Sequence, residues 1–400
     1  MGVLERGPAR SAGLDGVRGV AVAGVLLFHA GHLGGGFLGV DLFFALSGYL
    51  ITDLLLREVG SDGTVSLVAF WGRRFRRLLP ALTLLMAGTT LAVWALGEPD
   101  LRATALSDGP WVQANLVNWH LLAESAGYWD GFGPGRVFGH LWSIAVEEQF
   151  YLVWPVVVLL VARAVERVEH GVALVAVVVS VLSLVLVVLL FTPGDPTRVY
   201  TGTDTRASSL LLGALAATAP VRRAVVEAVG RRVVPAQVLV TGALAVLWTS
   251  ADGEDAHWLF RGGLFAHSLL AALLVLLCAR TPDSAVTRLF GWAPLRGLGL
   301  VSYGLYLWHW PVFVVLSEDR LGLHGWARTG VLCAVSLGLA VLSKVLVEDP
   351  IRFRAPWARG RTGLAVLAAA TVALAALWVV VPEPPAARID VGDLHVSRVG

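Results

Sequence analysis

The stretch LDGVRGVAVAGVLLFH, residues 14–29, decides the fold, because it is an apolar run of membrane length that contains Arg18 and His29. Charged and titratable side chains are costly inside a membrane helix and are typical of a functional interior. Eleven helical steps return to within about 20° of the starting direction, so both side chains share one face, about 16 Å apart along the axis. This face predicts the wall of a cavity, with a cation towards one end and an imidazole deeper inside.

The composition extends this interpretation to the whole chain. Its 400 residues are 56% hydrophobic and 15% charged, with a mean hydropathy of +0.72. These values exclude ordinary soluble domains and predict an all-α, polytopic integral membrane bundle in the lipid bilayer. Cys278 and Cys333 lie in apolar runs without ligand spacing, so we interpret them as small apolar residues and expect no metal site. The net charge of +2 gives no case for a nucleic-acid partner.

Eleven apolar runs approach or reach the length of a membrane span. They cover residues 14–32, 37–56, 78–97, 140–162, 171–191, 207–219, 234–250, 262–279, 298–316, 329–347 and 363–381. The sixth run is short, and residues 111–123 form a weaker amphipathic stretch. If the N-terminus is cytoplasmic and successive spans cross the membrane in alternate directions, the connecting segments inside the cell hold 20 basic residues and those outside hold nine. Arg206 is counted as outside. The positive-inside rule therefore predicts the cytoplasmic membrane, with the N-terminus in the cytoplasm and the C-terminus outside.

This topology divides the chain into three expected parts. Residues 1–350 form a ten-helix membrane domain, residues 351–381 a cytoplasmic loop and the eleventh span, and residues 382–400 a short extracytoplasmic tail. The longest connection, residues 98–139, is expected outside and is rich in Trp and acidic side chains. Two interpretations apply to it: an aromatic belt on an ordinary loop, or a surface that recognises a sugar-like acceptor.

Several later spans carry polar side chains that do not belong in lipid. They are Asp41, Ser143, Glu147, Glu148, Tyr151, Tyr303, Trp308 and His309. Ser143, Glu147 and Tyr151 share one helix face at four-residue spacing. Interhelical pairs, such as Asp41 or Glu147 with Arg18, would account for single carboxylates. A cavity with convergent charges better explains the whole set.

The run FWGRRFRRLLP, residues 70–80, places four arginines at the inner end of the third span. They are Arg73, Arg74, Arg76 and Arg77. One interpretation is topogenic, because positive charge holds a loop inside the cell. The other is ligand binding, because guanidinium groups bind phosphate oxygens in a bidentate manner. Four arginines in five positions exceed what orientation needs, which favours a phosphorylated cytoplasmic ligand whose far end points into the bundle.

These motifs together resemble acyltransferase family 3, the bacterial membrane O-acyltransferases that modify surface glycans, glycolipids and some antibiotics. The matching pieces are the Arg-x10-His pair and the runs at residues 39–49, 73–80, 142–151, 204–206 and 303–311. They keep the family's order and cover roughly residues 12–350. Many members continue into an extracytoplasmic SGNH-type domain, so residues 382–400 are either a tail or the truncated start of one.

The resemblance implies an enzyme that moves an acyl group, expected to be acetyl, from cytoplasmic acyl-CoA to a hydroxyl of a carbohydrate or glycolipid acceptor, often across the membrane. It implies that His29 is the essential histidine, Arg18 its partner and the Arg73–Arg77 run the motif that handles the donor. Together with the other polar residues of the spans, we predict three sets of site residues. The donor would be held by Arg18, Arg73, Arg74, Arg76 and Arg77. The catalytic set would be His29 as base, with Asp41, Glu147 or Glu148 as the supporting carboxylate. The acceptor would be bound by Ser143, Tyr151, Tyr303, Trp308 and His309.

Two alternatives stay open from the sequence. The acyl group could pass directly to the acceptor hydroxyl or through an acyl-imidazole on His29. A competing class is a secondary transporter or flippase, in which the intramembrane charges line a path and no covalent chemistry occurs.

Overall fold

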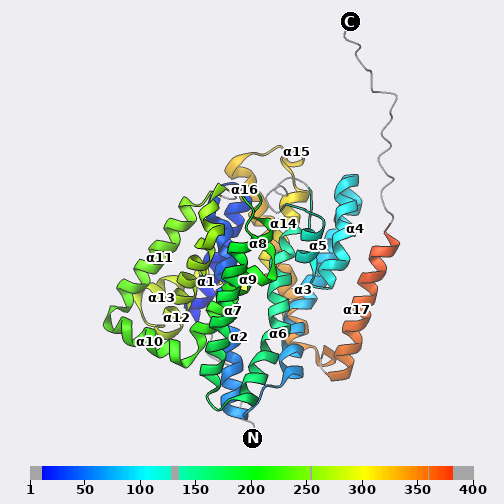
Figure 1. The fold of residues 1–400 in the computed structure, drawn as a ribbon. Coiled ribbons are helices and arrows are strands. Elements are labelled where there is room, and N and C mark those ends of the chain that lie inside the picture. Colours follow the sequence, from blue (N-terminus) through cyan, green and yellow to red (C-terminus); the bar gives the residue numbers. More distant parts are fainter. Residues whose placement is uncertain (1–10, 128–134, 253–254, 359, 382–400) are drawn as a thin grey trace, which may run out of the picture.

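The computed structural model describes residues 11–127, 135–252, 255–358 and 360–381. In these ranges the chain is a bundle of helices that lie side by side (Figure 1). The described residues contain no β-strand beyond an isolated bridge between Thr192 and Asp195. The all-α prediction is therefore confirmed.

The helices follow the predicted apolar runs. The long ones are α1 (Ala12–His29), α2 (Gly39–Asp62), α3 (Leu67–Leu96), α6 (Trp142–Ala164), α7 (Val168–Leu190), α11 (Val233–Ser250), α12 (Leu264–Arg280), α14 (Ala293–Val315), α16 (Gly325–Ser343) and α17 (Gly360–Val380). The shorter ones are α4 (Pro99–Gln113), α5 (Val117–Ala123), α8 (Thr197–Thr201), α9 (Thr203–Ala217), α10 (Ala219–Val229), α13 (Ala285–Phe290) and α15 (Glu318–Leu321). A 3₁₀ turn, η3 (Gly139–Leu141), leads into α6.

Within the described ranges, nine helical segments are long and apolar enough to cross a membrane, so the chain is a multi-pass membrane protein. Two predicted spans fall short of that standard: α9 has 15 residues, and the apolar part of α17 is Ala365–Val380. Helix α9 is almost entirely buried against α2, α7 and α12, so its apolar character reflects protein packing. The count of eleven spans and the orientation of the termini stay predictions.

The long connection between α3 and α6 contains helices α4 and α5, so it is more ordered than the predicted loop. Helix α17 lies at the edge of the bundle beside α3 and α4 (Figure 1). Gln113 fixes it there, donating to the carbonyl of Thr371 at 2.7 Å and accepting from the Trp378 indole at 3.0 Å. Trp129 and Asp130 of this connection, and residues 382–400, lie outside the described residues.

Close helix crossings at glycines set the positions of the site residues. A Cβ on Gly299 of α14 would lie 1.7 Å from the carbonyl oxygen of Asp15 in α1. A Cβ on Gly48 of α2 would lie 1.8 Å from that of Leu210 in α9. Small residues allow membrane helices to approach to backbone contact in this way. The first crossing holds the Arg-x10-His helix against α14, and the second holds α2 against α9.

Candidate active site

Two cavities within the described part of the bundle contain predicted site residues. The first encloses about 690 Å³, including its opening to solvent, and is lined by α1, α2, α3, α6 and α14. We call it the arginine chamber. Its polar lining residues are Arg18, Ser47, Arg74, Arg77, Ser143, Glu147, Tyr151, Ser302, Tyr303 and Tyr306. Three guanidinium groups therefore face one cavity that contains a single carboxylate.

The partners of these groups leave the positive charge of the chamber largely uncompensated. Glu147 accepts hydrogen bonds from the hydroxyl groups of Ser47 and, at 2.7 Å, Tyr151. The Arg74 guanidinium lies over the Tyr151 ring, 5.1 Å from its centroid. Among the described residues neither Arg74 nor Arg77 forms an ion pair, so both are placed to receive an anion.

The structure divides the arginine run by helical spacing. Arg74 and Arg77, three positions apart, line the chamber. Arg73 is exposed and pairs with Glu58 at 3.2 Å, and Arg76 is not a lining residue. The site prediction included all four arginines, but only two of them reach the cavity.

The second cavity encloses about 470 Å³, again including its opening. We call it the histidine chamber. It is lined by His29, Leu121, Ala126, Gly127, Arg136, Gly139, His140, Thr197, Thr201 and Trp310. The His29 and Trp310 rings pack together, with their centroids 4.7 Å apart.

The two chambers lie end to end along the same helices. Helix α1 contributes Arg18 to the arginine chamber and His29 to the histidine chamber. Helix α14 runs in the same sense, contributing Tyr306 to the first and, one turn later, Trp310 to the second. Arg18 and His29, eleven residues apart on α1, therefore line two different chambers. The sequence had predicted one cavity containing both side chains.

A thin hydrogen-bonded layer separates the chambers. Ser143 lines the arginine chamber, and its Oγ lies 2.5 Å from the Tyr306 hydroxyl. The Tyr306 hydroxyl also donates to the backbone carbonyl of His140 at 3.0 Å. Ser143 lines one chamber and His140, three residues earlier, lines the other. The layer between them is therefore about one helical turn thick, where η3 leads into α6.

His29 is oriented by a second histidine. His309 Nδ1 lies 2.6 Å from the carbonyl of Tyr306, which can only accept, so this nitrogen carries a proton. In a neutral His309 imidazole, Nε2 is then an acceptor, and it lies 3.0 Å from Nδ1 of His29. His29 must donate in this bond, so a neutral His29 carries its lone pair on Nε2. We assign this tautomer from the hydrogen bonds.

Asp41 is not brought to His29. It is fully buried and pairs with the equally buried Arg206 of α9, and its Oδ1 accepts from Ser209 and Ser268 at 3.0 Å each. An ion pair removed from water is held by such additional hydrogen bonds. Asp41 therefore connects α2, α9 and α12 as an interhelical pair, with Arg206 in place of the Arg18 partner considered from the sequence. Arg206, counted as external by topology, lies inside the bundle.

Two other predicted site residues also lie away from both chambers. Glu148 is buried but does not line either cavity. Trp308 packs towards α3, where a Cβ on Gly88 would lie 3.3 Å from its ring. Tyr303 does line the arginine chamber, and its hydroxyl donates to the carbonyl of Leu78 at 2.9 Å.

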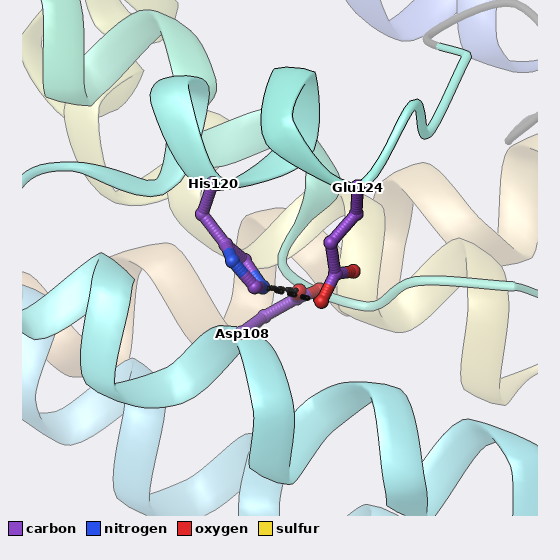
Figure 2. Close-up of side chains that lie close together, drawn as sticks. All are labelled: Asp108, His120 and Glu124. Atoms are coloured by element: carbon purple, nitrogen blue, oxygen red, sulfur yellow. Dashed lines mark ion pairs between the residues drawn. The ribbon is translucent and has the colours of Figure 1, made fainter.

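A polar cluster borders the histidine chamber, on α4 and α5. His120 Nε2 lies 3.3 Å from Asp108 Oδ1 and 3.4 Å from Glu124 Oε1 (Figure 2). These side chains are of the kinds that bind divalent metals. However, the Arg136 guanidinium already pairs with both carboxylates, at 2.5 Å to Asp108, and supplies the cation. Since Arg136 lines the histidine chamber, the cluster ties that wall to α4 and α5.

The same cluster gives a pH-dependent prediction. Burial raises the pKa of Asp108 from 3.8 to about 6, although Arg136 opposes the shift. A raised pKa favours the folded state while the carboxyl is protonated, and that contribution is lost as pH rises through about 6. A rise of this size in the pKa corresponds to roughly 3 kcal/mol of unfolding free energy. The melting temperature of detergent-purified protein, relative to Asp108→Asn, should fall between pH 4.5 and 7.5; parallel pH profiles would contradict this.

A multi-pass helical bundle with a cationic chamber, a histidine chamber and a buried layer between them defines a class: a membrane-embedded enzyme with polar cavities inside its helices. A family model described as "Acyltransferase domain" matches residues 11–345. The chain belongs to this family, acyltransferase family 3. The resemblance seen in the sequence is thereby confirmed.

Three relatives show where this chain stands within the family. Over 85% of its own length, the chain is 38% identical to the protein of Bacillus subtilis strain 168 named putative peptidoglycan O-acetyltransferase YrhL. Over the same share of its length it is 36% identical to the peptidoglycan O-acetyltransferase OatA of Listeria monocytogenes. It is 33% identical to the O-acetyltransferase OatA of Staphylococcus aureus over 86%. The matches cover 54%, 55% and 58% of these relatives, so the chain spans little more than half their length. No solved structure matches the chain.

Proposed function

We propose that the protein is an O-acetyltransferase of the cytoplasmic membrane that moves an acetyl group from cytoplasmic acetyl-CoA to a hydroxyl of a cell-envelope glycan, with peptidoglycan as the first candidate. The names of the relatives support an O-acetyl product and a peptidoglycan acceptor. The observation that carries the proposal is the end-to-end arrangement of the two chambers along α1 and α14. A donor and an acceptor can then enter from opposite ends and meet at the layer.

The arginine chamber suits the donor. Coenzyme A carries phosphate groups at one end and its thioester at the other, so it needs cations at the mouth and an open path behind them. Arg74 and Arg77 supply guanidinium groups without ion pairs, and Arg18 stands further along α1 towards His29. In the proposal the phosphates bind Arg74 and Arg77, and the pantetheine arm extends past Arg18 to the layer.

The chemical step follows from the tautomer of His29. Its Nε2 takes the proton of the acceptor hydroxyl as the hydroxyl oxygen attacks the thioester carbonyl. The carbon–sulfur bond breaks, and the departing thiolate takes the proton from the His29 imidazolium. His309, held by the Tyr306 carbonyl, orients His29 in the role that the sequence gave to a carboxylate. Transfer through an acetyl-imidazole on the same nitrogen uses the same geometry.

The division of the arginine run tests donor binding. Arg74→Gln with Arg77→Gln should raise the KM for acetyl-CoA by about 10- to 100-fold, because two charge-assisted phosphate contacts are lost. The matched control, Arg73→Gln with Arg76→Gln, removes the same charge outside the chamber and should change KM less than about threefold. The measurement is acetyl transfer by purified protein at varied acetyl-CoA concentrations. Equal effects of the two double variants would show that the run acts through overall charge.

A further inference from the structure

His140 is a buried polar group that the proposed chemistry does not use. The residue is 3% exposed and lines the histidine chamber with His29. Its Nε2 lies 3.1 Å from the backbone carbonyl of Leu307, which can only accept, so Nε2 carries the proton. In the neutral imidazole Nδ1 is then an acceptor. This atom has no hydrogen-bond partner among the described residues.

An unpartnered acceptor at this place is costly, because a buried polar atom without a hydrogen bond loses its interaction with water and gains nothing in return. His140 also stands beside the proposed reaction centre. The ring centroids of His29 and His140 lie 5.0 Å and 5.4 Å from that of His309, so two imidazoles flank the same residue. Both residues also line the histidine chamber, so the wall that contains His29 contains a second imidazole with a lone pair.

We propose that His140 is an acceptor-binding residue: its Nδ1 accepts a hydrogen bond from a second donor of the acceptor, adjacent to the hydroxyl that reacts at His29. This inference rests on the proposed function and narrows its substrate class. One hydroxyl cannot give its single proton to both imidazoles. The fitting acceptor therefore carries neighbouring donors, as a sugar does in its adjacent hydroxyl and amide N–H groups, whereas a simple alcohol does not.

The chain offers a matched pair of substitutions at this position. In His140→Gln the amide NH₂ can reach the Leu307 carbonyl in place of Nε2, while the acceptor at Nδ1 is lost. In His140→Asn an amide oxygen can stand in the place of Nδ1, while the bond to Leu307 is lost. If His140 has a purely structural role, His140→Gln should be tolerated better than His140→Asn. If His140 binds the acceptor, His140→Asn should be tolerated better than His140→Gln.

The probe is soluble glycan strands from peptidoglycan, with acetyl-CoA as donor. His140→Gln should raise the KM for the strands about 10-fold or more, because a donor of the bound glycan is left unpaired. His140→Asn should stay within about threefold of the wild type, and the KM for acetyl-CoA should be unchanged in both variants. Equal losses in the two variants, or a loss only in His140→Asn, would overturn the proposal.

A binding measurement separates this inference from the proposed function. Calorimetric titration of the strands into the purified protein, without acetyl-CoA, should show the same order: the wild type and His140→Asn tight, His140→Gln about 10-fold weaker. If this order appears but no acetyl is transferred, the proposed function fails and the role of His140 stands. If acetyl is transferred and His140→Gln binds and reacts as the wild type does, the role of His140 fails alone.

Discussion

Replacing His29 by alanine is expected to lower O-acetylation by about 10²- to 10⁴-fold, because the variant has no group to take the proton of the acceptor hydroxyl. The protein should still accumulate in the membrane, since the side chain faces a cavity and the close approach of α14 to α1 at Gly299 does not involve it. The measurement is the acetyl content of acceptor glycans per amount of folded protein.

His32→Ala is the matched control for this prediction. His32 lies three residues further along, where it bonds to Thr329 at 2.9 Å and stacks on Trp326, and it lines neither chamber. Its loss should leave the acetylation rate within about twofold. Retained activity in His29→Ala would remove that residue from the chemistry.

Replacing Asp41 by alanine should have the largest effect on stability. It leaves the Arg206 guanidinium buried without its carboxylate, a change that costs roughly 3 to 5 kcal/mol of unfolding free energy. We expect a strongly reduced melting temperature and less protein in the membrane. The double variant Asp41→Asn with Arg206→Met, which removes both charges, should recover much of the loss.

Asp53→Ala is the control on the same helix. The Asp53 carboxylate pairs with Arg57 at 2.5 Å, and that arginine side chain is 61% exposed, so the pair contributes little to the free energy of unfolding.

The activity per folded molecule separates the two roles considered for Asp41, an interhelical ion pair and a catalytic carboxylate. If the folded fraction of Asp41→Ala loses acetylation as completely as His29→Ala does, Asp41 acts in catalysis and the interhelical interpretation is wrong.

Much of the fold could be predicted because membrane helices carry their signal locally. Length and hydropathy placed most of the long helices near their bounds, but α3 begins at Leu67, eleven residues before the predicted run at 78–97. The same measure could not place α9, a short apolar run of 15 residues that neighbouring helices bury. Hydropathy reports only that a face avoids water, and lipid and protein satisfy that requirement equally.

The sequence could predict which kinds of residue form the candidate site, but it could predict only some of the contacts between them. Helical spacing put Arg18 and His29 on one face, and Ser143, Glu147 and Tyr151 on another. It could not pair Asp41 with Arg206, because that contact depends on the crossing of α2 and α9. Residue type favoured a carboxylate as the support for His29, whereas the side chain within hydrogen-bond distance of its Nδ1 is that of His309.

His140 shows the reverse case. It stands two residues before the run at 142–151, and a histidine at the end of a span has no distinguishing pattern in the sequence. Its interest arises from a single hydrogen bond to Leu307, which fixes the tautomer and leaves Nδ1 without a partner. Such information lies in the tertiary structure alone.

The most direct test of the two-chamber mechanism is transfer of labelled acetyl across a sealed vesicle that contains the purified protein. Acetyl-CoA is supplied on the side of the arginine chamber, and glycan strands are enclosed on the side of the histidine chamber. We predict covalently acetylated glycan with the wild type, none with His29→Ala, and none when donor and acceptor both lie on the histidine side. Label that crosses the membrane without a covalent product would contradict the account and indicate a transporter.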